Sequence, residues 1–388
     1  MVERNESNNP VKTENILSLT NDRGVIPYDE KGDVGNKSKD DITGYKLACV
    51  GDIVLNSMNV FIGSVGLSKY YGCVSPVYYV LHKRHEKDDI RFYNYLFQTR
   101  ELQRKLHGYG NGILDIRMRI QMSKLNTVPI PIPDSAIQKK IADYLDEKCL
   151  KIDKTIMLQK KIISKISQYY FSVVSELVYN DSKNVKLIKL GKVLQKVEQG
   201  WSPSPEDTKD ENGWKVLTLA AVKGGVFHAD EVKPFIGKED RCKQLELQKG
   251  DFLLTRSNTR NLVGQVCIVD NAIQNTIFSD LIYRLSFDEN YIDKDYMLFV
   301  FQSAFLRQQI ERDAHGSSST MVKITHKDIN SWDIPLPDKV IQRKISEKLM
   351  RLKERLTKEI SVRELLIEKY TKYKYSLIYE VVTGKKEV

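Results

Sequence analysis

Two long stretches of the chain place apolar residues at steps of three and four, which is the spacing of a helix with one apolar face. In the first stretch these residues are Ile141, Leu145, Ile152, Ile156, Ile163, Ile166, Tyr170, Val173 and Leu177, and in the second they are Ile345, Leu349, Leu352, Leu356, Ile360, Ile367, Tyr370, Leu377 and Val381. Each predicts a helix of roughly 40 residues, about 60 Å long at 1.5 Å per residue.

Helices of this length exceed what one domain can cover, so we expect the two to bury their apolar faces on each other. The globular segment between them favours an antiparallel pair. The alternative is that each helix only covers the sheet of its own domain. Both stretches follow a Pro-x-Pro-Asp sequence, and proline cannot continue a helix. The helices are therefore predicted to begin just after Asp134 and Asp338, with each aspartate as N-cap.

The segments before the two helices favour strands with a few short helices. Strands are expected where β-branched and aromatic residues lie between turn signals, at 46–55, 77–81, 251–255, 263–269 and 282–287. One or two short helices are expected inside each copy, for example at 93–106 and 296–312. The fold class is therefore α+β, in two tandem domains that are each followed by a long helix.

The two halves of the chain are related by an internal repeat. Pro131 to Ile141 matches Pro335 to Ile345, and the same 204-residue offset relates Ser75 to Ser279, Phe97-Gln98 to Phe301-Gln302 and Ile120 to Ile324. Further upstream, Gly51-Asp52 matches Gly250-Asp251 at an offset of 199 residues. We expect this five-residue difference to lie in a loop. The predicted boundaries are 1–134 for the first domain, 135–182 for its helix, 183–337 for the second domain, and 338–388 for its helix and tail.

Composition and charge bound the class of protein. The chain has 388 residues, of which 41% are hydrophobic and 29% charged, with a formal net charge of +10. This positive balance favours a polyanionic partner, because neutralising phosphates releases counterions. No apolar run is long enough for a membrane span, and residues 1–10 are polar and give no secretory signal. The five cysteines form no CxxC pair, which favours reduced thiols in the cytoplasm and argues against a zinc module.

Motifs of self-contained enzymes are missing from the sequence. The chain has no GxxxxGK[ST] phosphate loop, no HExxH pair, and no Asn/Asp-Pro-Pro-aromatic motif of an adenine methyltransferase. Gly108-Tyr-Gly-Asn-Gly112 lacks the GxGxxG spacing of a dinucleotide fingerprint. We therefore expect no catalytic, cofactor-binding or metal-binding residues in this chain.

The order of domain, Pro-x-Pro-x-x-x-x-Gln-x-x-Ile helix, second domain and second such helix resembles the specificity subunit of type I restriction–modification enzymes. Ser376 to Lys385 is similar to that family's C-terminal ending, and the Gly-Ser-Ser-Ser-Thr sequence at 316–320 is similar to its pattern before a helix. The resemblance covers nearly the whole chain. It departs at the start, because 50 residues precede Gly51 whereas 63 separate Leu187 from Gly250. The first domain is thus expected to be compact or truncated at its start.

The resemblance implies two target recognition domains that each read one half of a bipartite site in double-stranded DNA. It implies that the helices space the half-sites and dock two methyltransferase subunits. S-adenosylmethionine would belong to those partners, and ATP and Mg to a motor-nuclease subunit if one joins. The chain itself would be non-catalytic.

Loops rich in Arg, Lys, Asn, Ser and Thr are the candidate DNA contacts, since these side chains bond base edges or phosphates. In the second domain we single out one group after the Gly-Asp strand and another before the helix. The candidates there are Thr255, Arg256, Ser257, Asn258 and Arg260, and then Ser317, Ser318, Ser319, Thr320 and Lys323. The first-domain candidates are Asn56, Ser57, Asn59, Arg117 and Arg119. An ordinary polar turn is the alternative for these loops.

Two other functions stay open on the sequence alone. A non-catalytic adaptor could use the same helices to join proteins without reading DNA. A self-contained nuclease or methyltransferase is the third hypothesis. Steep salt dependence of DNA binding would separate the first hypothesis from the adaptor, and cofactor binding by the isolated chain would support the third.

Overall fold

The computed structural model describes the chain except residues 22, 33–37, 39–40, 111–118, 180–185, 204–212, 236–238, 272 and 317–320. The described residues form two compact units. The first comprises Met1–Lys160 and Glu364–Val388, and the second comprises Lys161–Arg363. Each long helix therefore contributes one half to each unit.

The first unit is built on an antiparallel sheet in the order β1 (Val2–Glu3), β8 (Tyr78–His82), β5 (Ile53–Asn56) and β6 (Val65–Leu67). Two further strand pairs are β2 (Leu17–Thr20) with β3 (Gly24–Pro27), and β4 (Lys46–Ala48) with β7 (Gly72–Val74). Its short helices are η1 (Tyr28–Lys31), η2 (Val60–Ile62), α1 (Ile90–Phe97), α2 (Arg100–His107) and α3 (Met122–Leu125).

The second unit repeats this sheet in the order β10 (Leu194–Gln199), β19 (Ile282–Phe287), β15 (Phe252–Thr255) and β17 (Val266–Ile268). A smaller sheet joins β14 (Val232–Phe235), β11 (Trp214–Leu217) and β18 (Thr276–Phe278). Three pairs complete it: β12 (Val222–Lys223) with β13 (Val226–Phe227), β16 (Ser257–Asn258) with β20 (Val322–Lys323), and β9 (Leu187–Lys189) with β21 (Asp333–Pro335). The short helices are η4 (Leu190–Lys192), η6 (Leu219–Ala221), α5 (Glu239–Leu245), α6 (Lys294–Gln302), α7 (Ala304–Asp313) and α8 (His326–Ser331).

The strand register shows where the two copies differ in length. Ile53 pairs with Leu67 and Leu81, whereas Phe252, its counterpart, pairs with Ile268 and Leu285. The second copy therefore has two extra residues between β15 and β17 and three more between β17 and β19. The five-residue difference lies between strands, as predicted, but in two connections instead of one.

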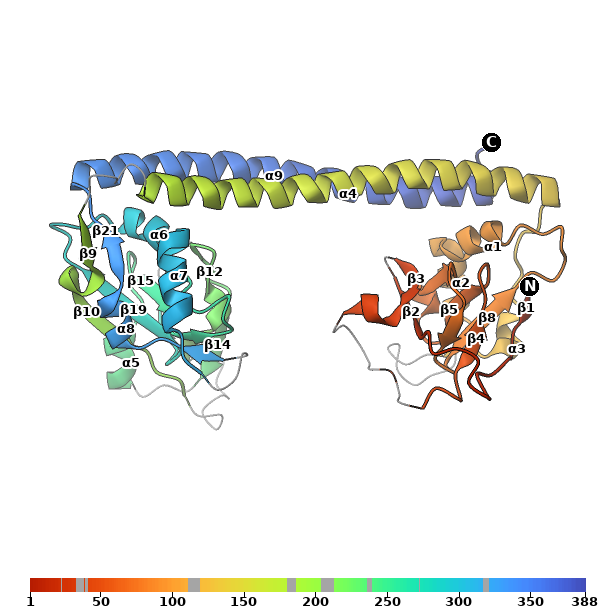
Figure 1. Ribbon diagram of the computed structural model, residues 1–388, viewed down its shortest axis with the longest axis horizontal. Coiled ribbons are helices and arrows are strands. Elements are labelled where there is room, and N and C mark those ends of the chain that lie inside the picture. Colours follow the sequence, from red (N-terminus) through yellow and green to blue (C-terminus); the bar gives the residue numbers. More distant parts are fainter. Residues whose placement is uncertain are drawn as a thin grey trace. The chain divides into compact units, whose positions relative to one another are not determined.

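The long helices are α4 (Ser135–Tyr179) and α9 (Lys339–Val382), and both begin directly after the predicted aspartates. In the first unit, Ile152 of α4 and Leu377 of α9 share one apolar cluster, and Lys374 Nζ contacts Asp153 Oδ2 at 2.7 Å. In the second unit, Val174 of α4 shares a cluster with Ile345 of α9. In each unit the beginning of one helix thus lies beside the end of the other, which confirms the predicted antiparallel pair (Figure 1).

The same clusters also contain side chains of the two four-stranded sheets, such as Leu55 in the first unit and Leu254 in the second. In each unit, parts of both helices therefore pack on the sheet in addition to packing on each other. Of the one or two short helices expected in each copy, the stretches at 93–106 and 296–312 each contain two. The break falls at Thr99 and Ser303, because each hydroxyl accepts the backbone N–H of the third residue of the following helix, Leu102 or Leu306.

One buried glutamine fixes the start of each long helix. Gln138 Oε1 accepts the N–H of Asp89 at 3.1 Å, and its Nε2 donates to the carbonyl of Pro133 at 2.8 Å. The repeat partner Gln342 accepts the N–H of Asp293 at 2.9 Å and donates to the carbonyl of Pro337 at 2.8 Å. The glutamine of the repeated sequence motif therefore ties the proline segment and the domain to the first turn of the helix.

Candidate nucleic-acid interface

In the second unit, the two predicted contact loops come together although they are far apart in the sequence. Strands β16 and β20 pair antiparallel, with Ser257 opposite Lys323 and Asn258 opposite Val322. The backbone of His315 is hydrogen-bonded to Lys323 in both directions, at 2.9 and 2.8 Å. Residues 257–258 therefore lie beside 322–323, which in turn lie beside His315.

A stack of three side chains lies beside this strand pair. The guanidinium of Arg256 lies 5.6 Å from the ring centre of Tyr283, and its Nη1 donates to the carbonyl of Asp280 at 3.2 Å. The ring of His326 packs edge-on against the ring of Tyr283, with 4.7 Å between the two ring centres. Burial raises the pKa of Tyr283, and the nearby Arg256 cation opposes that rise. The tyrosine ring thus holds both a cation and an imidazole in fixed places.

Several polar side chains of this region are exposed to solvent. Lys323, His326 and Lys327 are exposed, and so is Arg260, whose Nη1 donates to the carbonyl of Glu311 at 2.9 Å. Asn258 is half-buried, and its Oδ1 accepts the N–H of Thr259. Cations of this kind can contact phosphates, and an arginine or asparagine in reach of a groove can bond base edges.

Four predicted contact residues lie in the interior instead. Ser57, Thr255 and Ser257 have no exposed surface, and Asn56 has 9%. Their oxygens are already engaged: the hydroxyls of Ser57, Thr255 and Ser257 donate to the carbonyls of Val77, Leu262 and Val322, and Asn56 Oδ1 accepts the N–H of Met58. We correct the prediction for these four residues, because a buried and bonded side chain cannot reach a base while the fold is intact.

The first unit repeats the frame of the site with other side chains. Tyr79, the counterpart of Tyr283, donates through its hydroxyl to the carbonyl of Ile120 at 3.0 Å, and Lys46 Nζ lies 5.2 Å from its ring centre. Arg119, which matches Lys323 by the 204-residue offset, is exposed, and Asn59 is half-buried. A lysine therefore covers the tyrosine in one unit and an arginine does so in the other. Arg117, Ser317, Ser318, Ser319 and Thr320 lie outside the described residues.

Sequence reasoning missed Tyr283, His326 and Lys327. Thr325 and Asp328 cap α8 reciprocally, with the Thr325 hydroxyl bonding the Asp328 carboxylate at 2.7 Å. A Thr-x-x-Asp sequence is a signal for a helix start, so the exposed first turn with His326 and Lys327 could have been found. The role of Tyr283 depends on its packing against Arg256, and no local pattern signals that.

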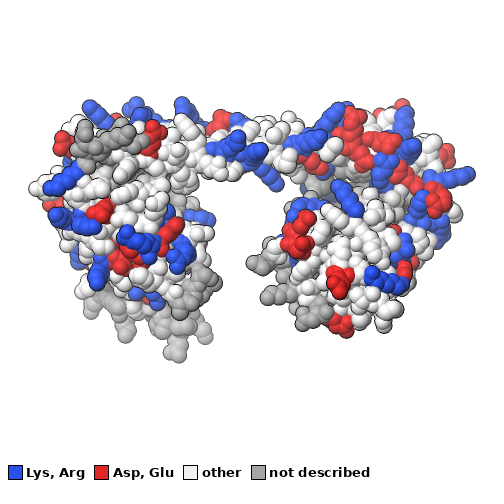
Figure 2. All heavy atoms as spheres, in the orientation of Figure 1, with Lys and Arg blue, Asp and Glu red and all other residues white. Residues whose placement is uncertain are grey.

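The charge of the described surface is dispersed. On the face drawn in Figure 2, Lys and Arg side chains lie among acidic and uncharged ones. Among the described residues no group of three or more His, Cys, Asp or Glu side chains could hold a metal ion. Within the same residues, no helix combines the length and apolar character that a membrane crossing requires.

Comparison with known proteins gives a consistent result. The family model of the type I restriction modification DNA specificity domain matches residues 8–168 and 182–363. The specificity subunit of type I restriction enzyme EcoEI from Escherichia coli is 28% identical over 159 residues, which cover 40% of this chain and 27% of that protein. The EcoKI specificity subunit from Escherichia coli strain K12 is 24% identical over 247 residues, or 60% of this chain and 52% of that protein.

The chain thus aligns with only part of the length of these two relatives. A solved structure of a type I R-M system, from work on its complex assembly and conformational transition, contains a chain with the same fold. It superposes with a TM-score of 0.69, at 13% identity, over 87% of this chain and 83% of that one. Each of the two repeats of this chain therefore corresponds to one match of the family model.

Proposed function

The chain belongs to the family of type I restriction modification DNA specificity domains, and from that premise we propose that it is the non-catalytic subunit that reads a bipartite DNA target. The observation that carries this proposal is the repeated frame with different surface chemistry. The same tyrosine position is covered by Lys46 in the first unit and by Arg256 in the second. Two related domains that carry different side chains on the same frame can read two different half-sites.

Exposed apolar and aromatic side chains recur at repeat-related positions of the long helices, which supports two copies of one kind of partner. Tyr169 and Tyr373 are 52% and 53% exposed, and Ile137 and Ile341 are 48% and 39% exposed. Tyrosine is enriched in protein interfaces. We propose that these positions dock two methyltransferase subunits, which would supply S-adenosylmethionine. A motor-nuclease subunit with ATP and Mg would be a further partner.

Reconstitution tests this function directly. Mixed with its cognate methyltransferase subunit and S-adenosylmethionine, the chain is expected to direct methylation of adenines in one two-part sequence, whereas each protein alone gives none. Sequencing of modified adenines in the treated DNA gives the readout. Failure of the chain to bind that subunit, or methylation without any sequence preference, would contradict the proposal.

Salt dependence tests the proposed interface in the second unit. Lys323→Gln and Lys327→Gln are each expected to weaken binding to all duplexes alike and to reduce the slope of log affinity against log salt by about 1. Each variant has one cation fewer to neutralise a phosphate, so its binding releases fewer counterions from the DNA. Fluorescence anisotropy on the target duplex between low and physiological salt measures both effects. Lys358→Gln, which changes an exposed lysine of α9 paired with Glu354, is the control and should leave the slope unchanged. An unchanged slope in both interface variants would show that these lysines do not contact the phosphates, whereas a lack of DNA binding by the unmodified chain would favour the adaptor hypothesis.

A further inference from the structure

The hairpin of β12 and β13 ends in a two-glycine turn that lies against the long helix α9. Gly224 and Gly225 have φ angles of +63° and +70°, the backbone that a tight two-residue hairpin turn requires. The carbonyl of Gly225 accepts a hydrogen bond from Lys353 Nζ of α9 at 3.2 Å. The N–H of Gly224 donates to Gln265 Oε1 at 3.0 Å. The turn therefore has one bond to the long helix and one to its own domain.

Gln302, at the end of α6, joins this turn to the other long helix. A Cβ on Gly225 would lie 2.3 Å from Gln302 Nε2, so the glutamine packs directly on the glycine. The hydroxyl of Tyr170 in α4 donates to Gln302 Oε1 at 3.3 Å. Burial raises the pKa of Tyr170 to about 12, so the hydroxyl keeps its proton at neutral pH. The hairpin, α6, α4 and α9 thus meet at one joint within the second unit.

The first unit is joined to its helices by a different set of contacts. Arg91 of α1 contacts Asp143 at 2.7 Å and Asp146 at 2.6 Å, both on α4. The hydrogen bond to Asp89 raises the pKa of the Arg91 guanidinium above its usual value, and the bonds to Asp143 and Asp146 add to this rise. The position that matches Lys353 by the repeat offset is Cys149, a buried residue of the apolar cluster. The repeat has therefore kept the frame of the two domains while changing how each is fastened.

We propose that the turn of the β12–β13 hairpin, with Lys353 and Gln302, is a positioning element that sets how the second recognition domain is held on the helix pair. On the spacing that the helices set, it would thereby limit how far the number of base pairs between the two half-sites can vary. This inference rests on the proposed function, because only a bipartite reader has such a spacing. These residues act through the orientation of the domain and not by contact with DNA.

Two neighbouring glycines give a matched pair of variants. Gly225→Ala adds a methyl group that displaces Gln302 and disturbs the joint. Gly224→Ala adds the same methyl group at the same kind of positive φ, but nothing lies within 4 Å of it. Both variants carry similar backbone strain, so a difference between them reports the joint. Lys353→Met removes the bond to the turn but keeps the aliphatic stem, and Lys358→Met is its exposed control.

Hydrogen exchange of the isolated chain tests the joint without DNA. We expect Gly225→Ala and Lys353→Met to speed the amide exchange of residues 222–227 by about two- to tenfold relative to their matched controls, which is the range for one lost hydrogen bond. Equal exchange in a variant and its matched control would show that the joint does not hold the hairpin and would overturn the inference.

Methylation of a panel of duplexes tests the consequence. The panel keeps both half-sites and changes the distance between them by one base pair in either direction. Discrimination against the altered spacings should fall by about two- to tenfold in Gly225→Ala and Lys353→Met and stay unchanged in both controls. Unchanged discrimination despite faster exchange would overturn the inference while leaving the proposed function intact. Failure of the unmodified chain to direct any methylation would overturn the proposed function itself.

Discussion

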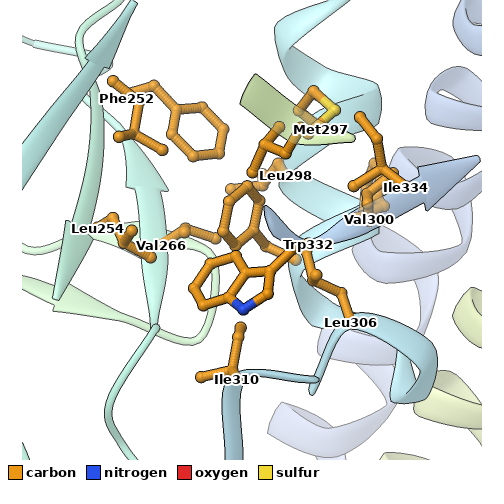
Figure 3. Close-up of a cluster of buried hydrophobic side chains, with 14 of the residues drawn as sticks. Phe252, Leu254, Val266, Met297, Leu298, Val300, Leu306, Ile310, Trp332 and Ile334 are labelled. Carbon is orange, nitrogen blue, oxygen red and sulfur yellow. The ribbon is translucent and has the colours of Figure 1, made fainter. Parts of the chain in front are cut away.

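Replacing Trp332 by alanine is expected to lower the free energy of unfolding of the second unit by about 3–5 kcal/mol, the cost of a large aromatic side chain removed from a core. Trp332 has no exposed surface and lies between side chains of the sheet, such as Leu254 and Val266, and helical ones, such as Leu306 (Figure 3). Its Nε1 also donates to Asp313 Oδ2 at 3.0 Å. The substitution therefore leaves a cavity in the core, and the carboxylate of Asp313 loses one hydrogen bond.

Urea unfolding of the whole chain measures this loss, with peptide-level hydrogen exchange to assign the transition to the second unit. Trp332→Phe should cost less, because it retains a ring in the cavity and loses mainly the bond to Asp313. Trp201→Ala is a useful comparison, since Trp201 is only half-buried. A loss in Trp332→Ala no larger than that in Trp201→Ala would contradict the assigned role.

Replacing Gln342 by leucine is expected to destabilise the second unit by at least about 2 kcal/mol, since buried polar groups without partners cost about 1–3 kcal/mol each. The buried amide group of Gln342 bonds the carbonyls of Tyr291 and Pro337 and the N–H of Asp293. Leucine has a similar size and satisfies none of these backbone groups. The lost contacts all lie where the domain meets the first turn of α9.

The repeat provides an internal comparison for this prediction. Gln138→Leu removes the corresponding bonds to Asp89 and Pro133 and should destabilise the first unit instead. Lys344→Leu, at an exposed position two residues after Gln342, should have little effect on either unit. Urea unfolding with hydrogen exchange assigns each loss to its unit. If Gln342→Leu and Lys344→Leu gave equal stability, the glutamine would not be the residue that fixes the start of the helix.

Much of the architecture could be predicted from local patterns. Helix periodicity gave the two long helices, and the prolines gave their first residues, because both signals depend only on neighbouring positions in the chain. Most predicted strands were close to those observed, for example 282–287 for β19. The single strand predicted at 46–55 was wrong, because this stretch forms two strands, β4 and β5, that belong to different sheets. One or two short helices were expected in each copy, and the stretches 93–106 and 296–312 each span two, because the capping by Thr99 and Ser303 interrupts the apolar pattern across them.

The contact residues were harder to predict, since exposure depends on distant parts of the chain. The segment with Thr255 and Ser257 is rich in polar residues, like an open loop. The pairing of β16 with β20 nevertheless buries Ser257, whose hydroxyl donates to the carbonyl of Val322, 65 positions later in the chain. The same pairing places Lys323 opposite Ser257 and leaves Lys323 exposed. Polar residue types alone could not separate the residues that shape this surface from those that face solvent.

The sequence by itself determined that this protein is a duplicated domain with two long amphipathic helices, because a repeat and a helical period are properties of the order of residues. Only the tertiary structure decided which side chains of the two copies reach the surface and how each domain is fastened to its helices. Lys353 and Gly225, or Arg91 and Asp146, are far apart in the chain, and their contacts exist only once the helices and sheets have packed.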